Sequence, residues 1–276
     1  MDRPPTIARV LGHLLVYAVA ASMVIPFVWM LSTALKSDAE ALNPHVSLIP
    51  HAWKWSNFAA AWEAANLGRY YWNSTAVALA NTVFSVLHCA LAGYAFAKLR
   101  FRGRRVMFLL ALVTMMLPIQ VYFIFAYVIA DRFGYVDTLQ GLYVPFLASG
   151  FGIFYMRQAI STVPDALLEA GRIDGMGEFE LFWIIVAPTI RPAIGALAIF
   201  TFVFSWNNFF WPLIMSDSDA STTLPLAISH LASGRYVQSW PQIMAAMTIL
   251  TVPLIVVFLV FQRTFVEGVA LTGIKE

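Results

Sequence analysis

The chain has 276 residues, of which 60% are hydrophobic and 12% charged, and its net charge at pH 7 is +2. A soluble domain carries about a quarter charged residues, so this composition excludes an ordinary soluble protein. The weak net charge does not favour nucleic acid as a partner. The single cysteine, Cys89, excludes an internal disulfide and a cysteine-based metal site.

Six stretches without Asp, Glu, Lys or Arg are long enough, or nearly so, to cross a bilayer, which takes about 20 residues as a helix. Backbone groups find no partner in lipid, so these spans are predicted to be helices of an all-α membrane protein. The first is too long for a signal peptide and is interpreted as an uncleaved span. The six stretches are 10–35, 73–97, 106–130, 139–156, 192–215 and 243–261, within a single membrane domain, 1–276.

The basic residues predict the orientation of the chain. With the N-terminus in the cytoplasm, the inner segments hold 12 Lys and Arg residues and the outer segments hold 5. Cytoplasmic loops are enriched in these residues, and the turn "KLRFRGRR" at 98–105 gives the strongest single signal. Both termini are therefore expected to be cytoplasmic.

Three polar positions stand out in the second and third spans. Asn81 and Gln120 either line a cavity or pack between helices, and Pro118 is expected to kink the third span. His88 is either a proton relay or, more simply, a hydrogen-bonding group between helices.

The longest predicted inner segment, residues 157–191, is here named the charged loop. Thr162 and Asp165 fit a capping box, and Pro164 suits the first turn of a helix. Gly175 and Gly177 then mark a bend, since glycine tolerates positive φ. The pattern predicts a short helix, a bend and an apolar segment that returns to the membrane. It fits a solvated connector or a surface on which a partner docks.

The loop sequence "EAGRIDGMGEFELFWIIVAPTIRP" resembles the EAA loop of ABC-importer permeases. Glu169, Ala170 and Gly171 occupy the EAA positions, Asp174 and Gly175 the Asp-Gly pair, and Pro188 the later proline. Gly171 departs from the usual alanine, which weakens the helix by up to about 1 kcal/mol.

Other segments are similar to the carbohydrate-type permeases, the maltose-like and glycerol-3-phosphate second permeases. They are "NSTAVALANTV", "AGYAFAKLRFRGRR", "FSWNNFFWPLI" and "VFQRTFVEGVALTGIKE", so that the resemblance runs from Val10 to Glu276.

The resemblance implies that the helix from about Pro164 to Gly175, between spans four and five, is a coupling helix that docks on a separate ATPase dimer. The residues implied in this coupling are Asp165, Glu169, Ala170, Gly171, Arg172, Asp174 and Gly175. No glycine is followed by lysine, so a phosphate-binding P-loop is absent. This chain is expected to bind no cofactor and no metal and to have no catalytic residue, with ATP and Mg²⁺ on the partner ATPase.

Span five carries polar and aromatic side chains that suit a sugar, although asparagine also bonds one helix to another in membranes. The candidates for the cargo pathway are Trp206, Asn207, Asn208 and Trp211, together with Gln120. The outer loop "SHLASGRYVQSWPQ" is implied to contact an extracytoplasmic solute-binding protein, unless it is a plain interfacial hairpin. Its candidates are Ser233, Arg235 and Tyr236.

The sequence therefore predicts the transmembrane subunit of an ATP-driven sugar importer in a bacterial or archaeal cytoplasmic membrane. A second, non-identical permease would complete the pathway. A phosphate cargo such as glycerol-3-phosphate is less favoured, because the spans contain no Lys or Arg, although the second permease could supply one. An ion-coupled carrier would need acids within the spans, and an intramembrane enzyme would need a motif such as HExxH; neither occurs.

Overall fold

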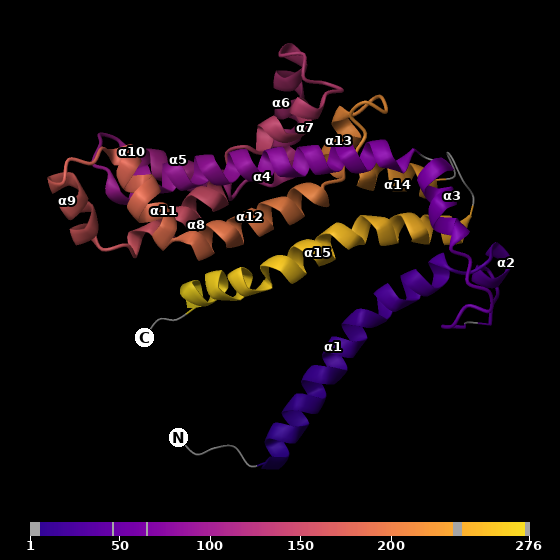
Figure 1. The fold of residues 1–276 in the computed structure, drawn as a ribbon. Helices are drawn as coiled ribbons and strands as arrows, with labels where there is room; N and C mark the ends of the chain where they lie inside the picture. Colours follow the sequence, from indigo (N-terminus) through magenta and orange to yellow (C-terminus); the bar gives the residue numbers. More distant parts are fainter. Residues whose placement is uncertain (1–5, 46, 65, 234–238, 274–276) are drawn as a thin grey trace. The chain divides into compact units, whose positions relative to one another are not determined.

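The computed structural model describes residues 6–45, 47–64, 66–233 and 239–273, and every regular element among them is helical. The helices follow the chain from α1 to α15 (Figure 1). An all-helical architecture is what lipid as a solvent demands, because each helix satisfies its own backbone. The predicted all-α fold class is confirmed for the described residues.

Three long helices are unbroken and carry apolar segments long enough to span a bilayer. They are α1 (Thr6–Ala34), α4 (Leu67–Lys98) and α15 (Trp240–Gly273), with apolar segments Val10–Ala34, Leu67–Lys98 and Trp240–Gln262. The first ends one residue before the expected first span, and the other two contain the expected second and sixth spans.

Three further candidate spans are bent pairs of helices, each either a broken span or a re-entrant loop. The first pair, α5 (Arg104–Thr114) and α6 (Ile119–Arg132), bends by 104°. The second pair, Leu139–Phe146 and α8 (Gly150–Ser161), bends by 49° and contains α7 (Leu139–Tyr143) and η1 (Val144–Phe146). The third pair, Glu178–Thr189 and α12 (Arg191–Trp206), bends by 83° and contains α10 (Glu178–Glu180), the π-helical η2 (Leu181–Val186) and α11 (Ala187–Thr189). If each pair is one span, the described residues hold up to six.

Two predicted spans are interrupted. The span over 106–130 was expected to kink at Pro118, and it bends by 104° at a break between Thr114 and Ile119, because Pro118 has no N–H to continue the helix ladder. The predicted helix over 192–215 ends at Trp206, and α13 (Phe210–Met215) follows as a separate element. There the Asn207 side chain donates to the Val203 carbonyl at 2.9 Å, a local bond of the kind that competes with helix continuation.

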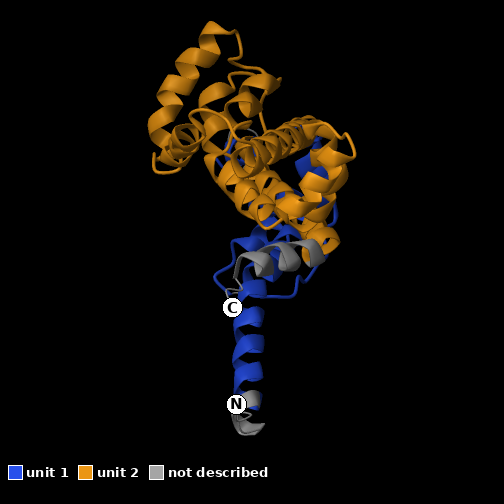
Figure 2. Ribbon diagram, turned by 90° about the vertical axis from the view of Figure 1, so that its left-hand side faces the viewer, with its two compact units in different colours: residues 1–68, 227–252 blue, residues 69–226, 253–276 orange. Residues whose placement is uncertain are grey.

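The chain divides into two compact units, which Figure 2 colours separately. Unit 1 comprises residues 1–68 and 227–252, and unit 2 comprises residues 69–226 and 253–276. Unit 1 contains the short helices α2 (Asp38–Ala41) and α3 (Ser56–Ala64), together with most of α14 (Leu224–Ala232). The prediction of a single membrane domain stays a prediction.

Unit 2 is held together by two apolar clusters and by a polar contact at the N-terminal end of α4. One cluster joins α4, α8, α9 (Asp165–Ile173), η2 and α12. The other surrounds Trp211 and Phe123. The Asn73 amide donates to three backbone carbonyls, those of Asp219, Ala220 and Thr222, at 3.4, 3.1 and 2.9 Å. This contact fixes the 219–222 segment beside the start of α4.

Candidate functional site: the charged loop and its anchor on α4

The predicted loop helix exists as α9, which spans Asp165–Ile173 within the expected range of 164–175. Asp165 lies in its first turn and Arg172 in its last, which matches the helix dipole at both ends. The predicted capping box is wrong: Pro164 is the N-cap and makes no side-chain cap, while the Thr162 hydroxyl donates to the Ala159 carbonyl at 2.8 Å. In place of a capping box, α9 is stabilised by these charges at its two ends and by the packing of its buried face.

The bend after α9 depends on one of the two predicted glycines. Gly175 has a φ of +86°, in the left-handed region that favours glycine. Gly177 has an ordinary φ of −74° and instead opens the next helix, where its N–H donates to a Glu180 carboxylate oxygen at 2.8 Å. The chain thus reverses sharply between α9 and α10.

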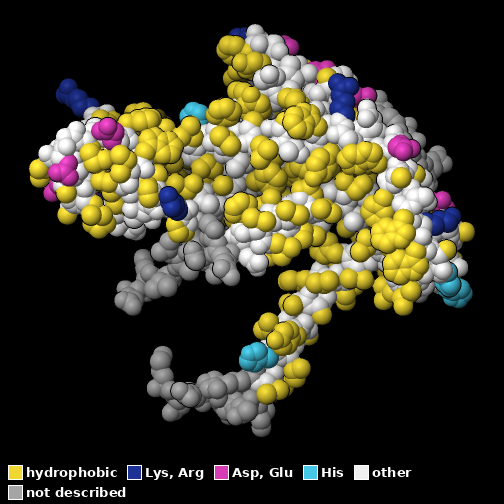
Figure 3. All heavy atoms as spheres, viewed as in Figure 1, with side chains coloured by type: hydrophobic (Ala, Val, Ile, Leu, Met, Phe, Trp, Pro, Cys, Tyr) yellow, Lys and Arg dark blue, Asp and Glu magenta, His cyan; other side chains and the backbone are white. Residues whose placement is uncertain are grey.

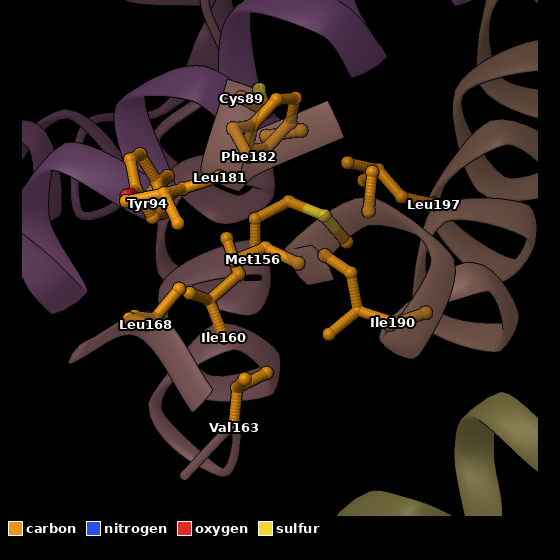
Figure 4. Close-up of a cluster of buried hydrophobic side chains, with 14 residues drawn as sticks. Cys89, Tyr94, Met156, Ile160, Val163, Leu168, Leu181, Phe182, Ile190 and Leu197 are labelled. Atoms are coloured by element: carbon orange, nitrogen blue, oxygen red, sulfur yellow. The ribbon is translucent and has the colours of Figure 1, made fainter. Parts of the chain in front are cut away.

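One face of α9 is packed against the membrane-spanning helices, as the cluster in Figure 4 shows. Leu168 and Gly171 are its buried residues, and they lie against Leu181 of η2. A Cβ built on Gly171 would lie 2.5 Å from Leu181 Cδ2 and 3.1 Å from Ile185 Cδ1. The glycine that departs from the EAA pattern therefore lets η2 approach α9 closely.

Two polar contacts join the charged loop to the C-terminal end of α4. The buried Lys98 ammonium donates to the Val163 carbonyl at 2.6 Å and to the Asp165 carboxylate at 2.7 Å. The Tyr94 hydroxyl donates to Glu178 at 2.5 Å, and the Arg172 guanidinium donates to the same carboxylate at 2.9 Å. These contacts hold the N-terminal end of α9 directly and its C-terminal end through Glu178, and they are here named the α4 anchor.

The charges of the α4 anchor reinforce one another. Hydrogen bonding and charge from Lys98 lower the pKa of the Asp165 carboxyl. The Arg172 guanidinium first, and the Tyr94 hydroxyl second, lower the pKa of Glu178. Both carboxylates are therefore ionised at neutral pH, and protonation would weaken the anchor only in acid, as the pH falls through these lowered values.

Sequence reasoning missed Tyr94, Lys98 and Glu178 as members of this site. Tyr94 and Lys98 are four residues apart in a helix, so their side chains share one face. That spacing, next to a charged loop, was the available signal. The partners themselves lie 67 and 84 residues further along the chain.

The opposite face of α9 is exposed. It carries Glu169, Ala170 and Asp174, which the sequence singled out, and also Ile173, whose side chain is 86% exposed. Acidic side chains gather over α9, at the left of Figure 3, whereas hydrophobic side chains dominate the visible surface of α4.

The five cargo-pathway candidates do not meet in one cavity. Trp206 and Trp211 are buried, and the Trp211 indole donates to the Gly141 carbonyl at 2.9 Å. Asn208 accepts from the Trp211 backbone N–H at 3.3 Å, and Asn207 bonds within its own helix as described above. Gln120 lines a shallow pocket with Phe210 and Ile214. Their role in the pathway stays a prediction.

The remaining candidates are placed as follows. His88 lies 2.6 Å, through Nδ1, from the Phe84 carbonyl of its own helix. Ser233 is exposed and donates to the His230 carbonyl at 2.9 Å, whereas Arg235 and Tyr236 lie outside the described residues. Across the described ranges, no three His, Cys, Asp or Glu residues are grouped to hold a metal ion.

Apolar helices of spanning length, joined by a charged loop that is anchored on one of them, define a multi-span membrane protein. Residues 89–270 match the model of a family described as "Binding-protein-dependent transport system inner membrane component". This chain belongs to that family.

Curated relatives and a solved structure agree with this membership. The chain is 31% identical to the arabinooligosaccharides transport system permease protein AraQ of Bacillus subtilis (strain 168), covering 91% of this chain and 90% of that one. It is 35% identical to the sn-glycerol-3-phosphate transport system permease protein UgpE of Yersinia enterocolitica, covering 84% and 85%. A crystal structure of a bacterial ABC transporter that imports alginate has the same fold, with a TM-score of 0.83, 21% identity and coverage of 96% and 99%.

Proposed function

We propose that this chain is the transmembrane subunit of an ATP-driven, binding-protein-dependent sugar importer. It crosses a bacterial or archaeal cytoplasmic membrane six times with both termini inside. It lines half of the pathway, and a second, non-identical permease lines the other half. An extracytoplasmic solute-binding protein delivers the cargo to the complex.

Coupling to ATP is assigned to the charged loop. In this proposal α9 is the coupling helix, and its exposed face with Glu169 and Ile173 docks on a separate ATPase dimer, which binds ATP and Mg²⁺. The single observation that carries this role is the α4 anchor, because a helix bonded to a spanning helix directly at its N-terminal end, and through Glu178 at its C-terminal end, transmits motion rather than absorbing it. A solvated connector would not need such bonds.

A neutral sugar is the favoured cargo. The relative AraQ is named for arabinooligosaccharides, which are neutral, whereas UgpE is named for a phosphate ester. A phosphate calls for Arg or Lys groups along the path, and none of the six stretches predicted from the sequence contains one. Glycerol-3-phosphate remains the second candidate, favoured only by the identity to UgpE.

Copurification tests the coupling role. Glu169→Lys reverses a charge on the exposed face of α9, so recovery of the ATPase with the detergent-solubilised complex should fall while membrane insertion is unchanged. The matched control is Glu63→Lys, which makes the same change at an exposed position of α3, on the proposed outer side. Equal recovery of ATPase from the two variants would contradict the docking role.

A further inference from the structure

A cavity of about 720 Å³ lies in unit 2, bordered by α4, α12 and the breaks before α6 and α8. That volume is within the range of small-molecule sites. None of its lining residues is Asp, Glu, Lys or Arg. Its polar lining consists of Asn81, Ser85, Thr114, Tyr122, Ser149 and Thr201.

One polar group in this cavity lacks a partner. Asn81 is 1% exposed, and its side-chain oxygen accepts no hydrogen bond within the described part of the chain. A buried amide oxygen without a partner is unfavourable and calls for an explanation. Among the described residues, Thr33 Oγ1 and Thr223 Oγ1 are also buried without a partner, but of the three atoms only the Asn81 oxygen belongs to a residue that lines this cavity.

The cavity lies at mid-depth of α4. Asn81 is 14 residues from Leu67 and 17 from Lys98, which places it about 21 and 26 Å from the two ends at 1.5 Å per residue. The non-helical stretches 115–118 and 147–149 contribute to its wall. Irregular backbone at membrane depth is tolerated where it is buried in protein or lines a water-filled cavity, so two breaks at one cavity indicate water rather than lipid.

Aromatic rings form the rest of the wall. Phe146 and Phe204 stand edge to face at 5.9 Å, and Phe151 and Phe200 do so at 6.4 Å. Hydroxyl and amide groups beside aromatic faces suit a sugar ring, which presents hydroxyls at its edge and C–H groups on its faces. The lack of charged lining disfavours a phosphate or a carboxylate.

We propose that this cavity is the binding site of this chain for a neutral sugar ring, with the Asn81 side-chain oxygen accepting a hydrogen bond from a sugar hydroxyl. The proposal rests on the importer function above and names the cargo contacts of this subunit. It assigns the site to the α4–α12 cavity instead of the α12–α13 junction, where Asn207 and Asn208 make local bonds.

Thiol labelling tests the site in the assembled complex with its ATPase, second permease and binding protein. Asn81→Cys is made in a Cys89→Ala background and treated with a charged, membrane-impermeant methanethiosulfonate. Leu79→Cys is the control, because Leu79 is 51% exposed and lies about 200° around the helix from Asn81. We expect the Asn81→Cys variant to react about tenfold faster than the Leu79→Cys variant, because the smaller cysteine side chain leaves room for the cavity water to reach its thiol, where the reactive thiolate forms, whereas a thiol in lipid does not form it. Thr201→Cys repeats the test should Asn81→Cys fail to accumulate.

The same labelling reports the chemical class of the ligand. A mixture of neutral mono- and disaccharides should slow the reaction, and glycerol-3-phosphate should not. Protection by glycerol-3-phosphate alone would overturn the neutral class, and labelling that neither probe slows would overturn the binding site. An unreactive Asn81→Cys variant in a complex that still copurifies with its ATPase would overturn the site as well, because lipid or a partner helix would then fill the cavity. If the chain without these substitutions did not copurify with an ATPase, that result would instead contradict the proposed function itself.

Discussion

The α4 anchor and the α4–α12 cavity use polar groups of the same helix in opposite ways. At the C-terminal end of α4, Tyr94 and Lys98 are each bonded to an acid of the charged loop. At mid-helix, the Asn81 oxygen is buried and has no partner in the described structure. Satisfied networks make a region rigid, whereas an unsatisfied buried group calls for an explanation, such as a water or a ligand. The contrast fits the two proposals made above, in which the C-terminal end of α4 transmits force and its middle binds the cargo.

The largest expected effect comes from cutting both contacts of the α4 anchor. Lys98→Met with Glu178→Met removes the ammonium that bonds Asp165 and the carboxylate that links Tyr94 to Arg172, while the exposed face of α9 keeps its residues. We expect transport per ATP hydrolysed to fall about tenfold, the middle of the range for coupling between sites, with ATPase copurification retained. Both quantities are measured on the complex in proteoliposomes.

The control for this pair is Asp174→Asn, which also neutralises a loop acid but touches no α4 residue in the described contacts. Its ratio of transport to hydrolysis should stay at the parent value. An anchor variant with an unchanged ratio would show that the loop transmits motion by another route, and one that loses the ATPase would show that the anchor shapes the docking face instead.

A smaller effect separates the two asparagines of α4. Asn73→Leu leaves three backbone carbonyls without their donor and should lower stability by about 1–3 kcal/mol. Asn81→Leu removes an unpaired oxygen, and replacing such a group by an apolar one of similar shape is nearly neutral or stabilising. Thermal unfolding in detergent compares the two. An equal loss of stability in both would mean that Asn81 supports the fold.

The sequence predicted features that depend on residues close together in the chain, and it missed contacts between residues far apart in the chain. The bounds of α9 and the positive φ of Gly175 follow from residues within a few positions of one another, and both were predicted closely. The break at Pro118 likewise has a local cause. The pairing of Tyr94 with Glu178 spans 84 residues, and no periodicity within one segment encodes it.

The cargo candidates show the same limit through residues that the sequence singled out but that the structure places in local contacts. Trp211 and Asn208 look like ligand groups in sequence because they are polar or aromatic within an apolar stretch. In the structure a helix break brings them into mutual and local contacts, and the Trp211 indole reaches the Gly141 carbonyl. Asn81 carried the same local signal, and only the packing of four distant segments around it shows that it faces a cavity.

The smallest expected effect concerns Gly171, where local preference and packing oppose each other. Alanine is the better helix former by up to about 1 kcal/mol, and the EAA pattern has alanine there. In this chain the added Cβ would lie 2.5 Å from Leu181 Cδ2, and Leu181 is fully buried. Overpacking costs typically about 1–3 kcal/mol, and the better helix propensity of alanine offsets up to about 1 kcal/mol of it, so Gly171→Ala should lower the resistance of the charged loop to proteolysis by a small amount.

Leu181→Val tests the cause, because it shortens the side chain that the new Cβ would meet. The double variant should be more stable than the sum of the two single effects predicts, with a coupling of about 0.5–3 kcal/mol in a double-mutant cycle. Resistance to limited proteolysis and thermal unfolding of the four proteins in detergent provide the cycle. If Gly171→Ala alone raised stability, Leu181 would have a second rotamer that the core accommodates, and the close approach of η2 to α9 would not depend on the glycine.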